Sequence, residues 1–274
     1  MRTAKQYLSY FQGSLPDWAC SDQQQLRQLV PENRRRAYDV RKVMDILADK
    51  NSVLELRRQF GEGIITALVR IEGHPFGLVA NNVFHMGGAV DADGADKFSR
   101  FIQVCDAYDL PLIVLIDTPG FMVGPDAEKT AQVRHFSRIF TNAVNATIPI
   151  FSVVLRKGYG LGAMAMAGGS FHTSSFIVSW PSGEFGGMGL EGAVRLGFKK
   201  ELDAIEDPEK RQQTYEELVA MHYEHGKAIN MASVLEIDEV IDPAETRHWI
   251  MCGLHSQPEP GTREGKKRPN IDCW

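Results

Sequence analysis

The sequence has little cysteine and no long apolar run. Its 274 residues include four cysteines, Cys20, Cys105, Cys252 and Cys273, and no pair has the spacing of metal ligands. No disulfide framework is expected, and reduced thiols are the default of a cytoplasmic protein. No stretch approaches the roughly 18 apolar residues of a transmembrane helix, and the first residues contain no apolar run of signal-peptide length. We therefore predict a cytoplasmic protein with no membrane contact.

A strong excess of charge of one sign is also absent. The formal net charge is -5 and the pI is about 5.9, so no global electrostatic field favours nucleic acid. Two short basic clusters occur, Arg34–Arg36 among acidic residues and Lys266–Arg268 in a polar C-terminal segment. We interpret both clusters as solvated surface, with contact to an anionic group such as a phosphate as the alternative.

Motifs for side-chain catalysis are scarce as well. The eight histidines form no metal-ligand spacing, and no GxSxG nucleophile elbow occurs. His85, His135 and His172 lie near the ends of expected elements, and we interpret them as hydrogen-bonded structural residues. Glu184 and Glu191 flank a glycine-rich loop, where helix capping or an ion pair is the favoured role. The sequence therefore predicts neither a metal site nor an obvious catalytic acid or base.

Hydrophobic periodicity indicates alternating helices and strands. Residues 1–30 are polar and predict a short helix and a linker, and apolar residues recur at helical spacing from Asp39 onward. We predict a strand hairpin at 64–71 and 76–80, helices at 93–107 and 128–145, strands at 112–116, 148–155 and 174–180, and a polar helical region from 191 to about 229. This alternation predicts an α/β fold.

Two of the expected strands are continuous apolar runs, Leu112–Ile116 and Ile148–Leu155. Such runs are typical of parallel strands that are covered on both faces by helices. We therefore expect the two strands to be neighbours in the core sheet. The glycine-rich segment after the second strand, from Gly158 to Ala163, is expected to reach the N-terminus of a helix.

Three expected strands end in loops that contain glycine. The loops are 116–121 (IDTPGF), 156–166 (RKGYGLGAMAM) and 180–189 (WPSGEFGGMG). Ligands of open α/β sheets bind beyond the carboxyl ends of the strands, and glycine lets the backbone approach a ligand closely. A helix N-terminus there adds unpaired N–H groups and a positive dipole end. The combination suits stabilisation of an oxyanion, whereas tight turns and close helix packing are the alternative explanation.

Three other motif matches are weaker. Asp117–Gly120 has the letters of the DTPG element of GTPases, but no GxxxxGK[ST] loop occurs. Gly187–Gly192 fits GxGxxG, yet several residues separate it from the preceding strand. The string Ala163–Met166 is similar to a biotin-attachment sequence but lacks the lysine. We predict that this chain has no nucleotide site and is not the biotin carrier.

In their order and spacing, several strings resemble the C-terminal domain of the carboxyltransferase (beta) subunits of biotin-dependent acyl-CoA carboxylases. This family includes propionyl-CoA, acetyl-CoA and long-chain acyl-CoA carboxylases. The resemblance runs from Val30 to Asp242, and residues 263–274 resemble the tail of a long-chain-type branch. The strings are CDAY with PL at 105–112, DTPGF with Gly124 at 117–124, RH at 134–135, RKGYG at 156–160, WP with Glu184 at 180–184, and MG with EGAV at 188–194.

The resemblance implies a crotonase-like (ClpP/crotonase) fold, a β-β-α superhelix in a single domain with an N-terminal helical extension. The expected organisation is an N-terminal helical extension or linker at 1–30, a crotonase-like carboxyltransferase C-terminal domain at 31–255, and a polar C-terminal tail at 256–274. In the family this domain binds carboxybiotin, and a partner N-terminal domain binds the acyl-CoA. The implied activity is transfer of the carboxyl group to acyl-CoA in fatty acid metabolism, and this half alone is expected to be inactive.

The family's site residues map onto the glycine loops. The resemblance implies that the backbone amides of Leu161 and Gly162 act in catalysis by forming an oxyanion hole for the ureido oxygen of biotin. Met164 occupies the position associated with acyl preference, where Asp, Ile or Gln is more usual, so the acyl group cannot be read from it. The implied biotin-binding residues are Gly120, Phe121, Gly158, Tyr159, Gly160, Leu161, Gly162 and Ala163.

The resemblance also implies partners. These are the N-terminal carboxyltransferase domain, the biotin carboxyl carrier and biotin carboxylase components, and further copies of this chain. Biotin is expected on another subunit or domain, acyl-CoA is the expected substrate, and no metal is expected in this chain. We expect the chain to be either a natural half-subunit or a fragment of a longer one.

Three alternative functions remain open. The chain could be a non-catalytic crotonase-like assembly subunit, or a component of a biotin-dependent acyl-CoA decarboxylase. A self-contained crotonase that hydrolyses or isomerises CoA thioesters is the third, although the sequence shows no clear acid or base for it.

Overall fold

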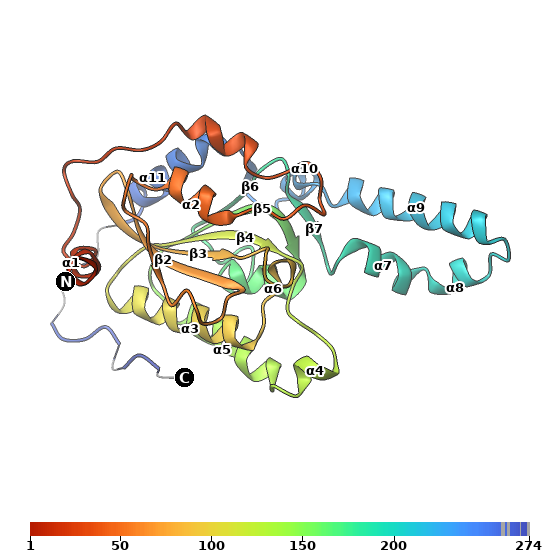
Figure 1. Cartoon of the computed structure of the whole chain (residues 1–274), viewed down its shortest axis with the longest axis horizontal. Coiled ribbons are helices and arrows are strands. Elements are labelled where there is room, and N and C mark those ends of the chain that lie inside the picture. The colour runs from red at the N-terminus through yellow and green to blue at the C-terminus, as the bar shows by residue number, and fades with distance from the viewer. Residues whose placement is uncertain (259–260, 262–263, 269, 273–274) are drawn as a thin grey trace.

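The computed structural model describes residues 1–258, 261, 264–268 and 270–272. In this part of the chain, one mixed sheet of eight strands forms the centre of the molecule (Figure 1). The spatial order is β1-β2-β3-β4-β5-β6-β8, and β7 pairs with the end of β5. The strands are β1 (Leu54–Leu56), β2 (Ile64–Ile71), β3 (His74–Asn81), β4 (Leu112–Thr118), β5 (Ile150–Tyr159), β6 (Phe176–Ser179), β7 (Glu184–Gly186) and β8 (Glu239–Val240).

The predicted strand neighbours are confirmed. β2 and β3 form an antiparallel hairpin whose register runs from Ile64–Asn81 to Ile71–His74. β3, β4, β5, β6 and β8 are parallel, and β4 lies directly beside β5. Because these parallel strands share a direction, their carboxyl ends lie at one edge of the sheet, called here the carboxyl edge. Their starts lie at the opposite edge, called here the amino edge.

Helices cover both faces of the sheet, which explains the continuous apolar strands. Alternate residues of β4 enter different cores, with Leu112, Val114 and Ile116 in one and Ile113 and Leu115 in the other. Below the sheet in Figure 1 lie α3 (Ala92–Ala107), α5 (Gln132–Val144) and α6 (Gly160–Met166). Above it lie α2 (Val40–Leu47) and α11 (Thr246–His255), and α1 (Arg2–Ser9) lies at one end.

The predicted helix at 128–145 is wrong at its start. Ala131 adopts a left-handed conformation with a φ of 55°, which a continuous α-helix cannot contain. The segment is therefore divided into the short helix α4 (Pro125–Glu128) and α5, which begins at Gln132. The strand expected at 174–180 is also shorter and runs from Phe176 to Ser179.

The polar region after residue 190 forms a helical arm that projects from the body (Figure 1). The arm consists of α7 (Leu190–Gly197), α8 (Lys199–Asp203) and α9 (Pro208–His225), and α10 (Ala228–Ser233) returns the chain to the sheet. None of the α9 side chains is fully buried. Its base is held where the Tyr223 hydroxyl donates to Glu191 at 2.8 Å. Short 3-10 helices occur at Gln23–Gln28 (η1), Met86–Gly88 (η2) and Pro243–Glu245 (η3).

The C-terminal basic cluster is not simply solvated. Lys267 Nζ lies 2.9 Å from an Asp106 carboxylate oxygen, and Arg268 pairs with the other oxygen of that carboxylate. The prediction of a solvated cluster is therefore wrong for these two residues, because the tail returns to the end of α3. The same prediction holds for Lys266, which is exposed.

The cysteines are unpaired where the structure describes them. Cys20, Cys105 and Cys252 are free thiols, and Cys273 lies outside the described residues. Burial raises the pKa of the Cys105 thiol, which keeps it protonated.

Within the ranges that the structure describes, no helix is long and apolar enough to cross a membrane.

Candidate functional site

The site lies at the carboxyl edge, where β5 passes directly into α6. Gly160, Leu161 and Gly162 form the first turn of this helix, as predicted. The first four N–H groups of an α-helix have no intrahelical acceptor, so the N–H groups of this turn are available to a ligand. Gly160 has a φ of 58°, and a side chain there would place its Cβ 2.5 Å from the Gly187 carbonyl oxygen. Glycine is therefore required where the strand turns into the helix.

The first turn of α6 rests on the loop that follows β4. A Cβ atom at Gly162 would lie 2.6 Å from Gly120 Cα and 2.8 Å from the Phe121 nitrogen. Gly120 has a φ of 118°, and its N–H donates to Thr118 Oγ1 at 3.1 Å. The Val90 N–H also donates to the Gly120 carbonyl at 3.0 Å. The two glycine loops thus form one packed unit, in which close backbone contact is possible only without side chains.

An apolar cavity of about 460 Å³ opens beside this turn. Of the residues predicted from the sequence, Gly158, Gly160, Leu161 and Met164 line it. The other lining residues were not assigned to the site from the sequence: three belong to the candidate loop at 180–189, and four come from separate loops and helices that only the fold brings together. These residues are Phe171, Phe185, Gly186, Gly187, Met231, Val234 and Glu236.

The remaining predicted residues do not line the cavity. Gly120 and Gly162 lie behind it in the packed loops, and the Ala163 side chain is fully buried. Phe121 stacks on Phe136 with ring centroids 3.6 Å apart. Tyr159 is turned away and donates its hydroxyl to Glu184 Oε2 at 3.1 Å. Their positions are those of residues that support the turn.

Glu184 is the centre of a polar cluster at the base of the arm. Besides Tyr159, it pairs with Arg34, whose guanidinium lies 3.8 Å from the centroid of the Tyr223 ring. Burial, followed by the charge of Glu184, raises the pKa of Tyr159, so its phenol stays protonated. The predicted ion-pair role of Glu184 is confirmed, and Arg34 pairs with it although the arginine side chain remains 49% exposed. A larger cavity of about 760 Å³, lined by Arg34 and Glu184 among others, includes none of the predicted biotin-binding residues.

The hydrogen-bonded structural role predicted from the sequence is confirmed for His135 and His85 but not for His172. His135 Nδ1 lies 2.8 Å from Asp96 Oδ2, and His85 Nε2 lies 3.0 Å from Asp91 Oδ2. His172 is exposed, 3.7 Å from Glu236. Within the described residues, no group of three or more His, Cys, Asp or Glu side chains is arranged to hold a metal ion.

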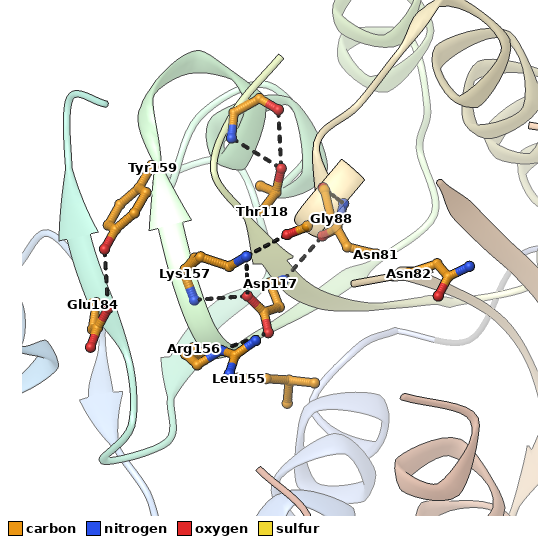
Figure 2. A network of polar contacts seen from close by, with 12 residues as sticks. Asn81, Asn82, Gly88, Asp117, Thr118, Leu155, Arg156, Lys157, Tyr159 and Glu184 are labelled. Carbon is orange, nitrogen blue, oxygen red and sulfur yellow. Dashed lines mark hydrogen bonds and ion pairs between the residues drawn. The ribbon is translucent and has the colours of Figure 1, made fainter. Parts of the chain in front are cut away.

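A buried network that the sequence did not reveal lies under the glycine loops (Figure 2). Its centre is Asp117, whose side chain is 1% exposed. Arg156 Nε donates to one carboxylate oxygen at 3.1 Å, and the Lys157 backbone N–H donates to the other at 3.2 Å. Burial lowers the pKa of the Lys157 ammonium, and the nearby Asp117 charge opposes this effect. The residue that resembled part of a nucleotide motif is thus an internal ion-pair partner.

Comparisons with known proteins identify the class to which this fold and site belong. A family model described as a carboxyl transferase domain matches residues 1–270. The chain therefore belongs to the carboxyl transferase domain family. The resemblance to acyl-CoA carboxylase beta subunits seen in the sequence is confirmed.

Two curated relatives illustrate this membership. The methylmalonyl-CoA carboxyltransferase 12S subunit of Propionibacterium freudenreichii subsp. shermanii is 34% identical over 263 residues, which are 94% of this chain and 49% of the relative. The biotin-dependent long chain acyl-coenzyme A carboxylase beta4 subunit of Mycobacterium tuberculosis is 34% identical over 234 residues, 84% of this chain and 44% of the relative. The chain spans about half the length of the curated relatives it matches.

Solved structures support the same family membership. A single-chain, multi-domain long-chain acyl-CoA carboxylase has a TM-score of 0.84 and 55% identity, covering 91% of this chain and 24% of that one. The transcarboxylase 12S structure has a TM-score of 0.82 and 32% identity, covering 95% of this chain and 50% of that one. The mixed α/β fold is thus the crotonase-like fold of carboxyltransferases, as predicted.

Proposed function

We propose that this chain is the biotin-facing half of a carboxyltransferase from a biotin-dependent acyl-CoA carboxylase. The observation that carries the proposal is the first turn of α6, which begins directly at the carboxyl end of β5 beside an apolar cavity. Family membership supports the reaction class. The proposal assigns binding of carboxybiotin to this half and binding of acyl-CoA to a partner N-terminal domain.

The residues present fit a biotin ring system. The cavity of about 460 Å³ is within the roughly 300–1,000 Å³ of small-molecule sites, which are mostly apolar with few polar groups. Phe171, Phe185 and Met164 would contact the ring faces, and the N–H groups of Leu161 and Gly162 would donate to the ureido oxygen. Gly158 and Gly160 keep this side of the cavity open.

The chemistry then depends on backbone donors. When bound, carboxybiotin supplies the carboxyl group that is transferred to an acyl-CoA, and negative charge develops on the ureido oxygen. Donors that already point to such a charge stabilise the transition state without reorganisation. Glu184 is occupied by Tyr159 and Arg34, so we assign it no part in proton transfer. Leu161 and Gly162 are the residues to which we assign catalysis.

The exposed apolar side chains at the cavity support a partner. Leu161 and Val234 both line the cavity and are 64% and 69% exposed. Exposed apolar groups at a site are typical of surfaces that another chain covers. We propose that the N-terminal domain and further copies of this chain cover them, and that the biotin carboxyl carrier and biotin carboxylase act with this assembly in the cytoplasm. Sedimentation should detect at least a dimer, and a strict monomer at all concentrations would contradict self-association.

A long-chain acyl-CoA is the substrate class we favour. The structural neighbour at 55% identity is named as a long-chain acyl-CoA carboxylase, whereas the 12S subunit is 34% identical. Met164, which lines the cavity, is the residue we assign to acyl preference. The preference for long acyl chains is tested by measuring carboxylation of acyl-CoAs of different length by the enzyme reconstituted with its N-terminal domain.

Gly187→Leu is a sharper test of the biotin site than a change at Gly162. Nothing lies within 4 Å of a Cβ atom at Gly187, and this glycine lines the cavity. Leucine there should therefore fill the cavity without disturbing the fold. Gly197→Leu is the matched control, because its Cβ also meets nothing and the residue lies at the end of α7, away from the cavity.

The measurement is an NMR titration of the labelled chain with free biotin and, separately, with acyl-CoA. We expect biotin to shift the amides of Leu161 and Gly162, and acyl-CoA to bind only after the N-terminal domain is added. Gly187→Leu should weaken biotin binding by about tenfold or more, the effect of about 1.4 kcal/mol, while Gly197→Leu leaves it unchanged. If the chain binds neither compound even after reconstitution, the result would favour a non-catalytic assembly subunit. If the isolated chain binds acyl-CoA, the result would favour a self-contained crotonase.

A further inference from the structure

The register between β4 and β5 changes beside the site. Ile116 pairs with Val154, but Thr118 pairs with Gly158. Two steps along β4 therefore correspond to four along β5, so that β5 contains two additional residues in this interval. Bulges of this kind redirect a strand and often lie next to active sites. Here the bulge determines where Gly160 stands and therefore where α6 begins.

Asp117 fills the irregularity in the ladder. It lies between the two paired residues of β4, and its carboxylate accepts the Lys157 N–H at 3.2 Å and Arg156 Nε at 3.1 Å. A buried backbone N–H without an acceptor would be costly, and the carboxylate supplies that acceptor. Arg156, which is 3% exposed, in turn donates to the Arg36 carbonyl at 2.9 Å. The side chain thus fixes the additional residues of β5 in place.

Asp117 is also held through its backbone N–H and by the Lys157 ammonium group. The Asn81 side chain accepts the Asp117 N–H at 3.1 Å and donates to the Gly88 carbonyl at 3.3 Å (Figure 2). Lys157 Nζ donates to the Gly87 carbonyl and lies 3.6 Å from the Asp117 carboxylate. The end of β3, the η2 turn, the end of β4 and the bulge in β5 are therefore linked through the backbone and side chain of Asp117.

Both glycine loops begin at this point. The chain leaves Asp117 into the turn at Thr118–Gly120, and it leaves the bulge into the turn at Gly160–Gly162, and these turns touch at Gly120 and Gly162. We propose that Asp117 is a positioning residue that sets the direction of the Leu161 and Gly162 N–H groups through the β5 bulge. This inference deepens the proposed function and rests on it for the identity of the ligand.

Asparagine cannot replace the carboxylate in this role. Arg156 Nε and the Lys157 N–H are both donors, so both need an acceptor on residue 117. The asparagine amide has one acceptor oxygen and presents an NH2 group to the other donor. Asp117→Asn should therefore release one side of the bulge while leaving the side-chain volume unchanged.

Asp49→Asn provides a matched control at the amino edge. Asp49 is 5% exposed, pairs with the buried Arg247, and accepts the N–H groups of Glu72 at 3.1 Å and Gly73 at 2.8 Å. Its chemistry repeats that of Asp117, but it holds the β2–β3 turn instead of the site. A general loss of stability should therefore appear in both variants, and a positioning effect in only one.

The first measurement is amide hydrogen exchange of the ligand-free chain, well below the melting temperature of both variants. In Asp117→Asn we expect exchange in residues 156–164 to be faster by about tenfold or more, as local opening becomes easier. In Asp49→Asn this segment should be unchanged, and the increase should occur at Glu72 and Gly73. Equal exchange in residues 156–164 for Asp117→Asn and wild type would overturn the proposal, and so would equal acceleration in the two variants.

The second measurement is turnover of the enzyme reconstituted with its N-terminal domain. For Asp117→Asn we expect kcat to fall by about 10²-fold, the effect of a misplacement of about 1 Å, with the KM for acyl-CoA unchanged. Asp49→Asn should retain the wild-type kcat per folded molecule, and a similar fall in kcat there would contradict the proposal. If Asp117→Asn does not fold, Asp117→Glu replaces it as the test variant, because glutamate keeps the charge but displaces the carboxylate. The rate of amide exchange in residues 156–164 of Asp117→Glu must then be higher than in wild type.

The two hypotheses can fail separately. A wild-type chain that binds no biotin, combined with the expected exchange pattern, would reject the proposed function and keep the positioning role. Biotin binding by wild type together with unchanged exchange and kcat in Asp117→Asn would reject the positioning role alone.

Discussion

The two edges of the sheet contain the same buried chemistry and use it differently. At the carboxyl edge Asp117 pairs with Arg156, and at the amino edge Asp49 pairs with Arg247. In both cases the carboxylate also accepts backbone N–H groups, and all four side chains are at most 6% exposed. Burial of an ion pair therefore does not by itself mark the edge at which we propose the biotin site.

The backbone that each pair holds makes the difference. At the amino edge Asp49 closes the β2–β3 turn, and Asp106 fastens the C-terminal tail through Lys267 and Arg268. The donors at the amino edge, which are the Gly73 N–H and the side chains of Lys267 and Arg268, thus find their acceptors within the chain. At the carboxyl edge the network holds the bulge in β5, from which the chain passes into the first turn of α6, whose N–H groups have no intrahelical acceptor. A site is thus better recognised by ordered but unpaired donors than by buried charge.

The largest expected effect comes from a side chain at Gly162. Gly162→Val should reduce biotin-dependent transfer by about 10²–10³-fold or more, as expected when oxyanion donors are lost. Valine would also push the Gly120 loop aside, because even a Cβ atom there lies 2.6 Å from Gly120 Cα. Loss of activity alone therefore cannot separate blocked ligand approach from displaced donors. Transfer assays in the reconstituted enzyme provide the measurement, and near-normal activity would contradict the site.

Gly73→Val is the corresponding change at the amino edge. Gly73 has a φ of 78°, and a Cβ atom there would collide with the Leu15 carbonyl. We expect lower stability but normal transfer activity per folded molecule. Circular dichroism gives the folded fraction that this comparison requires.

The second prediction compares stabilities directly. Asp49→Asn and Asp117→Asn should each lower the free energy of unfolding by about 3–5 kcal/mol, because each leaves a buried arginine without its counter-ion. Urea denaturation with an unchanged m-value would measure this loss. A loss in one variant only would show that the two ion pairs are not energetically equivalent.

The third prediction concerns the tail at the amino edge. Burial alone would raise the pKa of Asp106, but hydrogen bonds from Thr147, Lys267 and Arg268 outweigh it and lower the pKa below its ordinary value. A lowered folded pKa gives stability that is present above the unfolded value and lost as the pH falls through the folded value. Asp106→Asn should therefore lower stability by about 1–3 kcal/mol at pH 7.

The difference between Asp106→Asn and wild type should be fully present above about pH 4, the ordinary pKa of an aspartate, and should shrink as the pH falls further toward the lowered folded value. Thermal melts from pH 3 to pH 7 provide the measurement. A difference that stays constant on acidification would exclude the ionised carboxylate as its source.

The smallest effect is expected at Lys97 on α3. Burial lowers the pKa of this lysine to about 8, and its Nζ lies 3.4 Å from the Gly61 carbonyl oxygen. Because the folded pKa lies below the unfolded one, the burial penalty is fully present below pH 8 and disappears as the pH rises toward the unfolded value. Lys97→Met should raise stability by about 1 kcal/mol at pH 7, with the gain lost near pH 10. Melting curves at both pH values test this, and a gain independent of pH would point to packing instead.

Much of the architecture could be predicted from the sequence because it depends on local pattern. Continuous apolar runs indicated two parallel strands with both faces covered, and β4 and β5 are adjacent. Glycines placed directly after a strand indicated a strand-to-helix turn, and α6 begins at Gly160. The family strings added the crotonase-like fold, which periodicity alone does not specify.

Other features were decided only by the tertiary structure. Asp117 reads as part of a short motif, and its role arises because a register shift in a strand about 40 residues away brings two donors to its carboxylate. Phe171 and Val234 meet at one cavity because α6, α10 and the loops between them converge. Lys267 and Arg268 look solvated until the tail returns to α3. Local propensity acts over a few residues, whereas these contacts depend on how distant segments pack, and that is settled only when the whole chain has folded.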